Sequence, residues 1–530
     1  MAGRLAIDFG TCNTVVAIWD VANRQGVPLN LPGYAKLEQQ GDEQIAVLPS
    51  LIHYGEGGKK KIANQVFTGN VYHSERTFRW MKRYIMRRSP AKQRIDGRNL
   101  SHFDAGQDYL VHILQRLAQP VRISGEEIAV TVPVESFEHY ENWLCQVLES
   151  LRLTRYRIID EPSAAALGYG VRIQPGDVHL VFDFGCGTLD VSVIMIEPDA
   201  EGQAKCRCRI LGKAGADIGG ASIDQWLFAH VLEANKRPLD DEEARKMSRL
   251  MLVECERAKE LLSFNQSAAV SVMNPYTGGV LEAEIARPQF EELLDKHELY
   301  AQVVQTIRRA INASRERGYD EDAVKAVLMV GGSSLIPSVQ RSLHQFFGKD
   351  RVKLGRPLDA VARGAAAFVA GAQFVDYVQH DYAIRHVDRK TGQYDFRTIV
   401  RRGTPYPTKE PVDRFTIKAT YDQQNQMGIA IFEMDSQEHQ PQSGPVELVF
   451  DTAGMARLVT PTGDDLSARS QFWMNEHKPM FLHADPPAHQ GEPRFNVEFG
   501  IDSNKRLLVT VQDAKTGKLL HKDVPVVKLN

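Results

Sequence analysis

Val181-Phe-Asp-Phe-Gly-Cys-Gly-Thr-Leu-Asp-Val-Ser-Val-Ile194 has a near-copy at the start of the chain, Leu5-Ala-Ile-Asp-Phe-Gly-Thr-Cys-Asn-Thr-Val-Val-Ala-Ile18. In each copy an apolar strand ends near an Asp, a tight turn containing Gly follows, and a hydroxyl residue leads into a second strand rich in β-branched residues. This order of residues predicts a β-hairpin. Because the design occurs twice, it predicts two facing halves of one α/β domain.

The turns of the two hairpins carry the predicted chemistry. Gly10, Gly185 and Gly187 allow the backbone to approach a ligand closely and to point N–H groups at phosphate oxygens. Asp8 and Asp183 end strands of a buried type, where a carboxylate is costly unless a cation such as hydrated Mg²⁺ is paired with it. Two ordinary hairpins are the alternative, and a single such turn would favour it. The repetition favours a phosphate site.

The composition is that of a soluble globular protein. The 530 residues are 43% apolar and 25% charged, with a formal net charge of −3, which does not favour nucleic acid as the main partner. This length is typical of roughly three to four domain-sized units. The first Asp comes too early for a signal peptide, and no continuous apolar run of about 18 residues occurs, so we expect a cytoplasmic protein without a membrane partner.

The six cysteines are scattered and do not make a disulfide framework. Cys206 and Cys208 lack a second ligand pair for zinc, so we interpret them as strand residues.

A basic segment follows the first hairpin. Residues 76–88 are predicted to form a helix with most charges in solvent, from which we single out Lys82. Residues 89–101 are polar and contain Pro and Gly, which predicts a surface loop. The segment 108–118 then has the apolar spacing of a helix.

A β-α-β unit precedes the second hairpin. It consists of a strand at 127–133, a helix at 139–153 and a strand at 156–160. Glu161 comes directly after the last strand. It either complements the dipole of a following helix or belongs to a site at the carboxyl end of the sheet, and the two interpretations are equally favoured.

Glycine pairs mark two further turns after the second hairpin. Gly219 and Gly220 precede a helix that Ser222 could cap, and Gly331 and Gly332 connect a buried strand to a helix. Helical patterns dominate elsewhere, at 240–263, 288–317 and 359–371, the last of which is rich in small residues and predicted to pack tightly.

Beyond Ala372 long helical patterns disappear. From residue 384 to 530 alternating strands dominate, for example at 414–421, 428–433 and 494–512, while 436–444 and 484–493 have the composition of loops. This part is predicted to be a separate β domain.

These segments resemble, in order, the seventy-kilodalton heat-shock chaperone family. IDFGTCN (7–13) is similar to its first phosphate motif, VFDFGCGTLDVSV (181–193) to its second and VLMVGGSSLIPSVQ (327–340) to its adenosine motif. DEPSAAALGYG, CERAKELLS, TIVRRGTPYPTKE, ADPPAHQGEP and FNVEFGIDSNKRLLVTVQDAKTGK also look like family segments. The resemblance implies an α/β actin-like ATPase with two ribonuclease-H-like lobes at 1–376, a linker at 377–383 and an all-β sandwich for substrate at 384–530. We expect the chain to lack the family's helical lid.

The resemblance also implies ATP or ADP and Mg²⁺ as cofactors and assigns roles to residues by position. Asp8 and Asp183 would hold the Mg²⁺ shell. Lys82 would hold the attacking water and the γ-phosphate, Glu161 would orient and Thr188 would assist, as in phosphoryl transfer by positioning. The implied nucleotide contacts are Gly10, Thr11, Cys12, Asn13, Gly185, Cys186, Gly187, Gly219, Gly220, Glu256, Lys259, Ser263, Gly331, Gly332 and Ser333.

Departures from the family pattern matter as well. Glu260 and Leu335 stand where many members have Arg beside the adenine, so we expect weaker ATP binding. Cys12 and Cys186 replace a usual Thr and Gly. The linker contains Gln379 and His380 instead of apolar residues, which weakens the case for coupling between the domains.

We therefore expect a molecular chaperone with slow Mg²⁺-dependent ATP hydrolysis that binds unfolded or extended polypeptides, with a co-chaperone or nucleotide exchange factor as a further partner. The alternative is a nucleotide-regulated scaffold with little or no ATPase activity. A sugar or metabolite kinase is the weakest hypothesis, because no acceptor-substrate motif is found.

Overall fold

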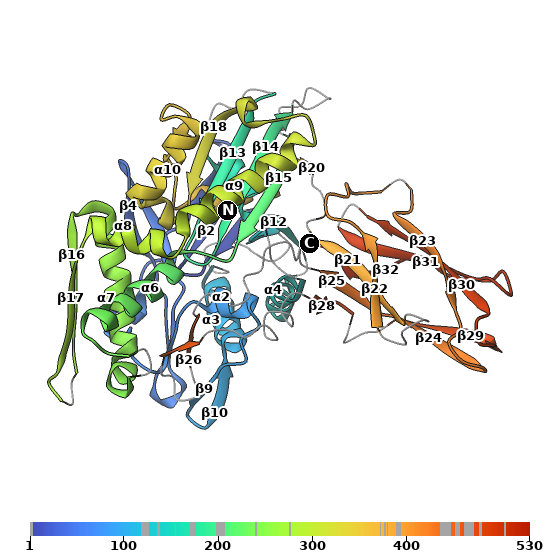
Figure 1. Cartoon of the computed structure of the whole chain (residues 1–530), viewed down its shortest axis with the longest axis horizontal. Helices are drawn as coiled ribbons and strands as arrows, with labels where there is room; N and C mark the ends of the chain where they lie inside the picture. The colour runs from blue at the N-terminus through green and yellow to red at the C-terminus, as the bar shows by residue number, and fades with distance from the viewer. Residues whose placement is uncertain are drawn as a thin grey trace. The chain divides into compact units, whose positions relative to one another are not determined.

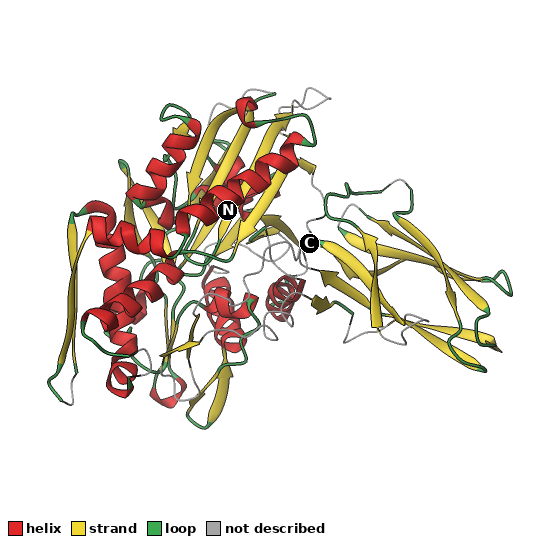
Figure 2. Ribbon diagram, viewed as in Figure 1, coloured by secondary structure: helices red, strands yellow, loops and turns green. Residues whose placement is uncertain are grey.

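The chain divides into two compact units. In this computed structural model the first unit comprises Met1–Glu135, Trp143–Phe374 and Pro445–Thr460, and the second comprises Ser136–Asn142, Val375–Gly444 and Pro461–Asn530. We call them the α/β unit and the β unit. The structure describes residues 4–117, 127–134, 138–153, 155–169, 176–197, 207–238, 241–274, 277–371, 373–375, 378, 380–387, 394–408, 410–434, 447–450, 456–459, 471–475, 480–502 and 505–529. Helices and strands are distinguished in Figure 2.

One sheet of the α/β unit is built around the first predicted hairpin. The antiparallel strands β1 (Leu5–Phe9) and β2 (Asn13–Asp20) pair Asp8 with Val15, which confirms the hairpin. The sheet order is β12-β11-β1-β2-β5-β4, in which β4 is Lys36–Gln40 and β5 is Glu43–Pro49. A further strand, β3 (Gln25–Pro28), pairs with β2. β11 (Ile128–Val132) and β12 (Tyr156–Asp160) are parallel, and α4 (Glu138–Ser150) connects them, which confirms the β-α-β unit.

A second sheet repeats this plan. β13 (Val178–Phe184) and β14 (Leu189–Glu197) form the second predicted hairpin, and the sheet order is β19-β18-β13-β14-β15-β20. In both sheets the first hairpin strand pairs in parallel with a later strand, β1 with β11 and β13 with β18 (Val324–Val330). α9 (Leu299–Arg315) crosses this sheet and contacts β15 (Arg207–Ala216) (Figure 1). The internal repetition predicted from the sequence is therefore also structural.

Two helices rich in small residues join the two sheets. α5 (Glu161–Gly168) and α11 (Ala360–Val369) share one hydrophobic cluster with residues of β1, β2, β13 and β18. A side-chain carbon added to Gly364 would lie 1.6 Å from the carbonyl oxygen of Ala164, and one added to Gly168 would lie 1.8 Å from that of Ala360. The prediction that the helix at 359–371 packs tightly is confirmed.

The other elements of the α/β unit lie around this centre. The helices are α1 (Asn64–Thr68), α2 (Met81–Met86), α3 (His102–Leu117), α6 (Gly220–Ala234), α7 (Glu242–Phe264), α8 (Arg287–Lys296) and α10 (Pro337–Phe347), with short 3₁₀ helices at Glu56–Gly58, Glu321–Ala323 and Gly332–Leu335. The remaining strands are β6 (Ile52–Tyr54), β7 (Lys60–Ile62), β8 (Thr77–Phe78), β9 (Lys92–Ile95), β10 (Arg98–Ser101), β16 (Ser267–Met273), β17 (Val280–Ala286), β19 (Val352–Lys353), β20 (Gln373–Val375), β26 (Glu447–Phe450) and β27 (Ala456–Val459).

Several local predictions for the α/β unit are wrong. Residues 92–101 form the hairpin β9–β10 instead of a loop, with its turn at Asp96 and Gly97, both at positive φ. Gly219 is the N-cap of α6, so Ser222 lies inside that helix and is buried. The helix predicted at 288–317 is two helices, because Glu298 adopts a left-handed conformation between α8 and α9.

The basic segment differs most from its prediction. Of its cations, Arg79, Lys82 and Arg83 are buried and only Arg88 is exposed, so the prediction that most of these charges are in solvent is wrong. Their partners lie far away in the sequence: Arg83 donates to Ser222 Oγ at 3.2 Å, and the partners of Arg79 and Lys82 belong to the site.

In its described part the β unit consists of strands, apart from residues 138–142, which begin α4. One sheet has the order β22-β21-β25-β28 and another β23-β30-β31-β32, and β24 pairs with β29. The strands are β21 (Asp381–Val387), β22 (Tyr394–Val400), β23 (Asp413–Lys418), β24 (Gln424–Ile429), β25 (Ile431–Met434), β28 (Gln471–Trp473), β29 (Met480–Ala488), β30 (Pro493–Ile501), β31 (Arg506–Asp513) and β32 (Leu519–Lys528). Both four-stranded sheets contribute to one hydrophobic cluster that includes Tyr382, Ile431, Phe495 and Val509.

Two details of the β unit refine the sequence interpretation. β29 and β30 occupy most of the predicted loop at 484–493, and only residues 489–492 connect them. The other predicted loop, at 436–444, lies outside the described residues. The last three residues of the predicted linker belong to β21, and Val378 and His380 are buried.

Candidate functional site

Asp8 and Asp183 lie near the ends of the first strands of the two hairpins, in surroundings that disfavour a charge. Thr131 Oγ1 donates a hydrogen bond of 2.8 Å to Asp8 Oδ1, and Asp183 is buried. Burial raises the pKa of both carboxyl groups, and the neighbouring carboxylates Glu161 and Asp190 raise the pKa of Asp183 further. These two groups therefore require compensating positive charge in order to stay ionised.

Lys82 supplies part of that charge. It lies in the first turn of α2, is buried and forms an ion pair with Glu161. Glu161 is the first residue of α5, whose N-cap Asp160 accepts the Ser163 N–H at 2.9 Å. Burial raises the pKa of Glu161 to about 7, and the Lys82 ammonium opposes that rise. The ion pair therefore links the basic segment to the carboxyl end of β12.

Among the described residues, the carboxylates of this group outnumber its cations. Asp8, Glu161 and Asp183 contribute three carboxylates, whereas Lys82 contributes one ammonium, and the second neighbouring lysine, Lys213, is paired with Asp160 at 2.6 Å. Within the described residues no group of three His, Cys, Asp or Glu could hold a metal ion directly. The donor set therefore fits a hydrated divalent cation such as Mg²⁺, which keeps several waters and needs only one or two carboxylates.

The turns of the two hairpins are in direct contact. A side-chain carbon on Gly187 would lie 2.4 Å from Thr11 Oγ1, so Gly187 packs directly against Thr11. Ser333 Oγ donates to the Gly185 carbonyl at 2.8 Å, and the Gly220 N–H donates to the same oxygen at 3.1 Å. The turn at Gly185, the start of α6 and the 3₁₀ helix after β18 therefore meet at one place.

A third glycine, at the end of β18, brings the second predicted glycine pair into this group. Gly331 has φ 82°, and a side-chain carbon on it would lie 2.3 Å from the Phe184 carbonyl oxygen. Gly332 is exposed beside it, Asn13 is exposed and Thr188 is half-buried. Gly10, whose added carbon would lie 2.1 Å from the Asn13 carbonyl oxygen, completes the first turn.

A disulfide joins the two turns. Cys12 and Cys186, 174 residues apart in sequence, have Cα atoms 5.9 Å apart and bonded sulfurs. Sequence reasoning missed this pairing, although one signal was available: each cysteine stands in the turn of a repeated hairpin. Cys208 is buried in β15, as predicted, and Cys206 lies outside the described residues.

The predicted nucleoside contacts on α7 already have protein partners. Glu256 Oε2 accepts hydrogen bonds from Tyr72 OH at 2.6 Å and Arg79 Nη2 at 2.5 Å. Burial opposes ionisation of Glu256, but Arg79 and Lys259 hold its pKa below the ordinary value. Lys259 Nζ lies 2.7 Å from Asp224 Oδ1. The sequence indicated none of Tyr72, Arg79 and Asp224, because each is remote from α7 along the chain.

Three further predicted residues lie at the edges of this region. Ser263 Oγ donates to the Lys259 carbonyl at 3.3 Å within α7. Burial raises the pKa of Glu260, and Leu335 is half-buried at the end of its 3₁₀ helix. Neither Glu260 nor Leu335 offers a planar cation to a base.

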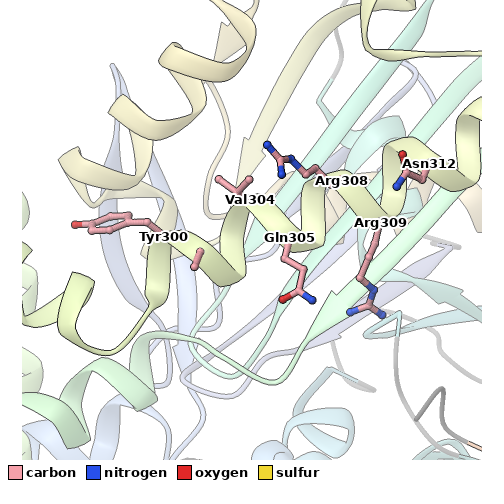
Figure 3. A pocket seen from close by; sticks show the side chains of 7 residues that line it. Tyr300, Val304, Gln305, Arg308, Arg309 and Asn312 are labelled. Carbon is pink, nitrogen blue, oxygen red and sulfur yellow. The ribbon is translucent and has the colours of Figure 1, made fainter. Parts of the chain in front are cut away.

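A separate hollow lies on the outer face of α9. Tyr300, Val304, Gln305, Arg308, Arg309 and Asn312 line it, all from that single helix (Figure 3). Arg309 also donates to the Gly215 carbonyl at 3.1 Å. The described residues that line the hollow include none of the predicted site residues and no carboxylate.

Comparison with known proteins identifies the family of this chain. The profile of the family described as "Hsp70 protein" matches residues 151–444, more than half of the chain. The chain belongs to the Hsp70 family. It is 28% identical to "Heat shock 70 kDa protein BIP3" of Oryza sativa subsp. japonica, over 90% of this chain and 70% of that protein.

Two other Hsp70 relatives match more of the chain. Identity is 25% to "Chaperone protein HscA homolog" of Polynucleobacter asymbioticus, over 97% of this chain and 76% of that protein. It is also 25% to "Heat shock cognate 70 kDa protein 3" of Dictyostelium discoideum, over 97% of this chain and 79% of that protein. Membership supports an ATP-dependent chaperone at the level of the family. None of the described helices is long and apolar enough to cross a membrane.

Proposed function

We propose that this Hsp70 protein is an ATP-binding chaperone that hydrolyses ATP slowly with Mg²⁺ and binds extended or unfolded polypeptide segments. The observation that carries the proposal is the meeting of two glycine turns beside the buried Lys82–Glu161 ion pair, with Asp8 and Asp183 in the same charged group. In the proposed arrangement the actin-like lobes are the two halves of the α/β unit, and the β unit is the substrate domain.

The proposed chemistry is positioning and charge neutralisation. Lys82 holds the γ-phosphate and the attacking water, and Glu161 keeps the ammonium in place through its ion pair. Asp8 and Asp183 hold the hydration shell of Mg²⁺, which supplies positive charge to the phosphate oxygens. Thr188 and the N–H groups of the turns bind phosphate oxygens.

Polypeptide binding is assigned to the β unit. An extended segment can add to a sheet through backbone hydrogen bonds, with pockets for alternate side chains. The edge strands of the described four-stranded sheets, β22, β28, β23 and β32, are the candidate sites. The proposed partners are unfolded polypeptides and a co-chaperone or nucleotide exchange factor, in the cytoplasm and without nucleic acid or membrane.

Steady-state phosphate release tests the proposal. Lys82→Ala should abolish release, because it removes the ammonium that pairs with Glu161 and lowers the pKa of Asp8 and Asp183. Lys325→Ala is the matched control, since that lysine pairs with Asp177 at the surface, and it should leave release unchanged. Equal release by wild type and Lys82→Ala would contradict an ATPase.

A scaffold that uses nucleotide only as a regulatory ligand is the second candidate. The observation that favours it is the engagement of Glu256 by Arg79 and Tyr72, which leaves this predicted nucleoside contact occupied by protein groups. Calorimetry with ATP and Mg²⁺ separates the two: binding without phosphate release supports the scaffold, and binding with release supports the chaperone ATPase.

A further inference from the structure

The disulfide between Cys12 and Cys186 stands inside the proposed nucleotide site. Cys12 belongs to the turn between β1 and β2, and Cys186 to the turn between β13 and β14. On one side of it Gly187 packs against Thr11, and on the other Cys12 Sγ lies 3.9 Å from Glu256 Oε1. The two sulfurs therefore lie between the phosphate turns and the predicted nucleoside contact on α7.

The backbones of the two bridged turns are too close together to bind one phosphate between them. A phosphate oxygen accepts a backbone N–H at a donor–acceptor distance of about 2.9 Å. The nitrogen atoms of two turns that bind one phosphate from opposite sides are therefore separated by two hydrogen-bond lengths plus the distance between the phosphate oxygens. The Cα atoms of Cys12 and Cys186 are 5.9 Å apart, which is an ordinary value for a disulfide. The covalent link prevents the turns from separating to admit the phosphate chain.

The link is not needed to hold the two halves of the α/β unit together. α5 and α11 form one hydrophobic cluster with strands of both sheets, and that cluster does not include either cysteine. Cys12 and Cys186 are both half-buried, whereas Cys208 and Cys255 are buried. A disulfide in a reducing compartment, such as the cytoplasm proposed above, is usually transient and redox-sensing instead of structural.

We propose that Cys12 and Cys186 are a thiol–disulfide switch on the nucleotide site: the disulfide lowers the affinity for ATP, and its reduction by a small dithiol restores that affinity. The inference rests on the proposed function, because it takes the two turns as the phosphate site.

The reaction is thiol–disulfide exchange. A thiolate of the external dithiol attacks one cysteine sulfur, the bond between Cys12 and Cys186 breaks, and a mixed disulfide forms. The second thiol of the reagent then displaces the remaining cysteine. The two cysteines gain two electrons and two protons, and the dithiol becomes a cyclic disulfide. The reverse reaction with that cyclic disulfide restores the bridge.

Calorimetry on the full chain tests the switch. ATP with Mg²⁺ is titrated into protein equilibrated with dithiothreitol and into protein equilibrated with its cyclic disulfide, and intact mass after maleimide alkylation verifies each state. The dissociation constant for ATP should be larger in the oxidised protein by about tenfold or more, which is within the usual range for coupling between sites. Cys12→Ser and Cys186→Ser should each give the same constant under both conditions, while Cys145→Ser should keep the wild-type difference.

A second measurement uses the wild-type chain alone. Because coupling is reciprocal, saturating ATP should shift the thiol–disulfide equilibrium toward the dithiol by the same factor by which the disulfide weakens ATP binding. Alkylation in graded mixtures of the two dithiothreitol forms measures that shift.

The outcomes are distinguishable. Weaker ATP binding by the oxidised chain, with a matching shift in the equilibrium, supports the switch. Equal ATP binding in both states, or alkylation of both cysteines after equilibration with the cyclic disulfide, overturns the switch and leaves the proposed function standing. A reduced protein that binds no ATP overturns the proposed function and the switch with it.

Discussion

Arg79→Met should cost this protein several kcal/mol of stability, because Arg79 and Glu256 form a buried ion pair. The side chains of Arg79 and Glu256 are 8% and 17% exposed, and Arg79 Nη2 lies 2.5 Å from Glu256 Oε2. Arg79 also stacks on the Trp80 ring, 4.6 Å from its centroid. Removing one partner of a buried pair costs about 3–5 kcal/mol, since the other charge is left uncompensated.

The lower end of this range applies here. Glu256 keeps its hydrogen bond from Tyr72 and some exposure, so we expect a loss of about 3 kcal/mol. The double variant Arg79→Met/Glu256→Gln should lose less than the sum of the single variants, because no unpaired carboxylate remains. Arg315→Met is the matched control: that arginine pairs with Glu321 at the surface, and its loss should cost about 0.5 kcal/mol or less.

Urea unfolding without nucleotide, followed by tryptophan fluorescence, measures these losses. Four of the five tryptophans, Trp19, Trp80, Trp143 and Trp226, belong to the α/β unit, so the signal reports mainly on the unit that contains the ion pair. A loss below about 1 kcal/mol for Arg79→Met, or additive losses in the double variant, would refute the reasoning that Arg79 compensates a buried charge.

Three further predictions concern the nucleotide and pH. Asp8→Asn and Asp183→Asn should each weaken Mg²⁺-dependent ATP binding, because each removes a carboxylate proposed to hold the hydrated ion; calorimetry with and without Mg²⁺ measures this. Leu335→Arg should tighten ATP binding by up to about tenfold, the factor that corresponds to roughly 1.4 kcal/mol of base stacking, in the same assay. Burial lowers the pKa of His102 to about 3. Below about pH 6.5 the unfolded chain therefore binds a proton at His102 that the folded protein does not bind. The contribution of His102 to the free energy of unfolding should fall by about 2 kcal/mol from pH 7 to pH 5. In urea unfolding, the free energy of unfolding of His102→Phe should decrease less between pH 7 and pH 5 than that of wild type, by this amount.

Each of these has a result that would contradict it. Equal ATP binding in wild type and both Asp variants would mean that the metal is held elsewhere or is not needed. An unchanged dissociation constant for Leu335→Arg would place the base away from the 3₁₀ helix. An unchanged pH slope in His102→Phe would show that His102 is not the buried neutral group that the fold requires.

The sequence determined the elements whose patterns are local. The two hairpins, the β-α-β unit, the strand and helix around Gly331 and the strand pair at 494–512 all depend on residues close together in the chain, and the structure contains each of them. Because the hairpin design occurs twice, the sequence also identified the two turns that meet in the α/β unit.

The tertiary structure decided which charges are buried and what they touch. The sequence of the basic segment predicted a solvated helix because the carboxylates that pair with it are distant in sequence. Glu161 is 79 residues from Lys82, and Glu256 is 177 residues from Arg79. A buried cation such as Lys82 or Arg79 is stabilised by the carboxylate that the fold brings to it. The disulfide has the same origin. Each cysteine by itself is compatible with a turn. Cys12 and Cys186 are 174 residues apart in sequence, and only the packing of the two sheets brings them within bonding distance.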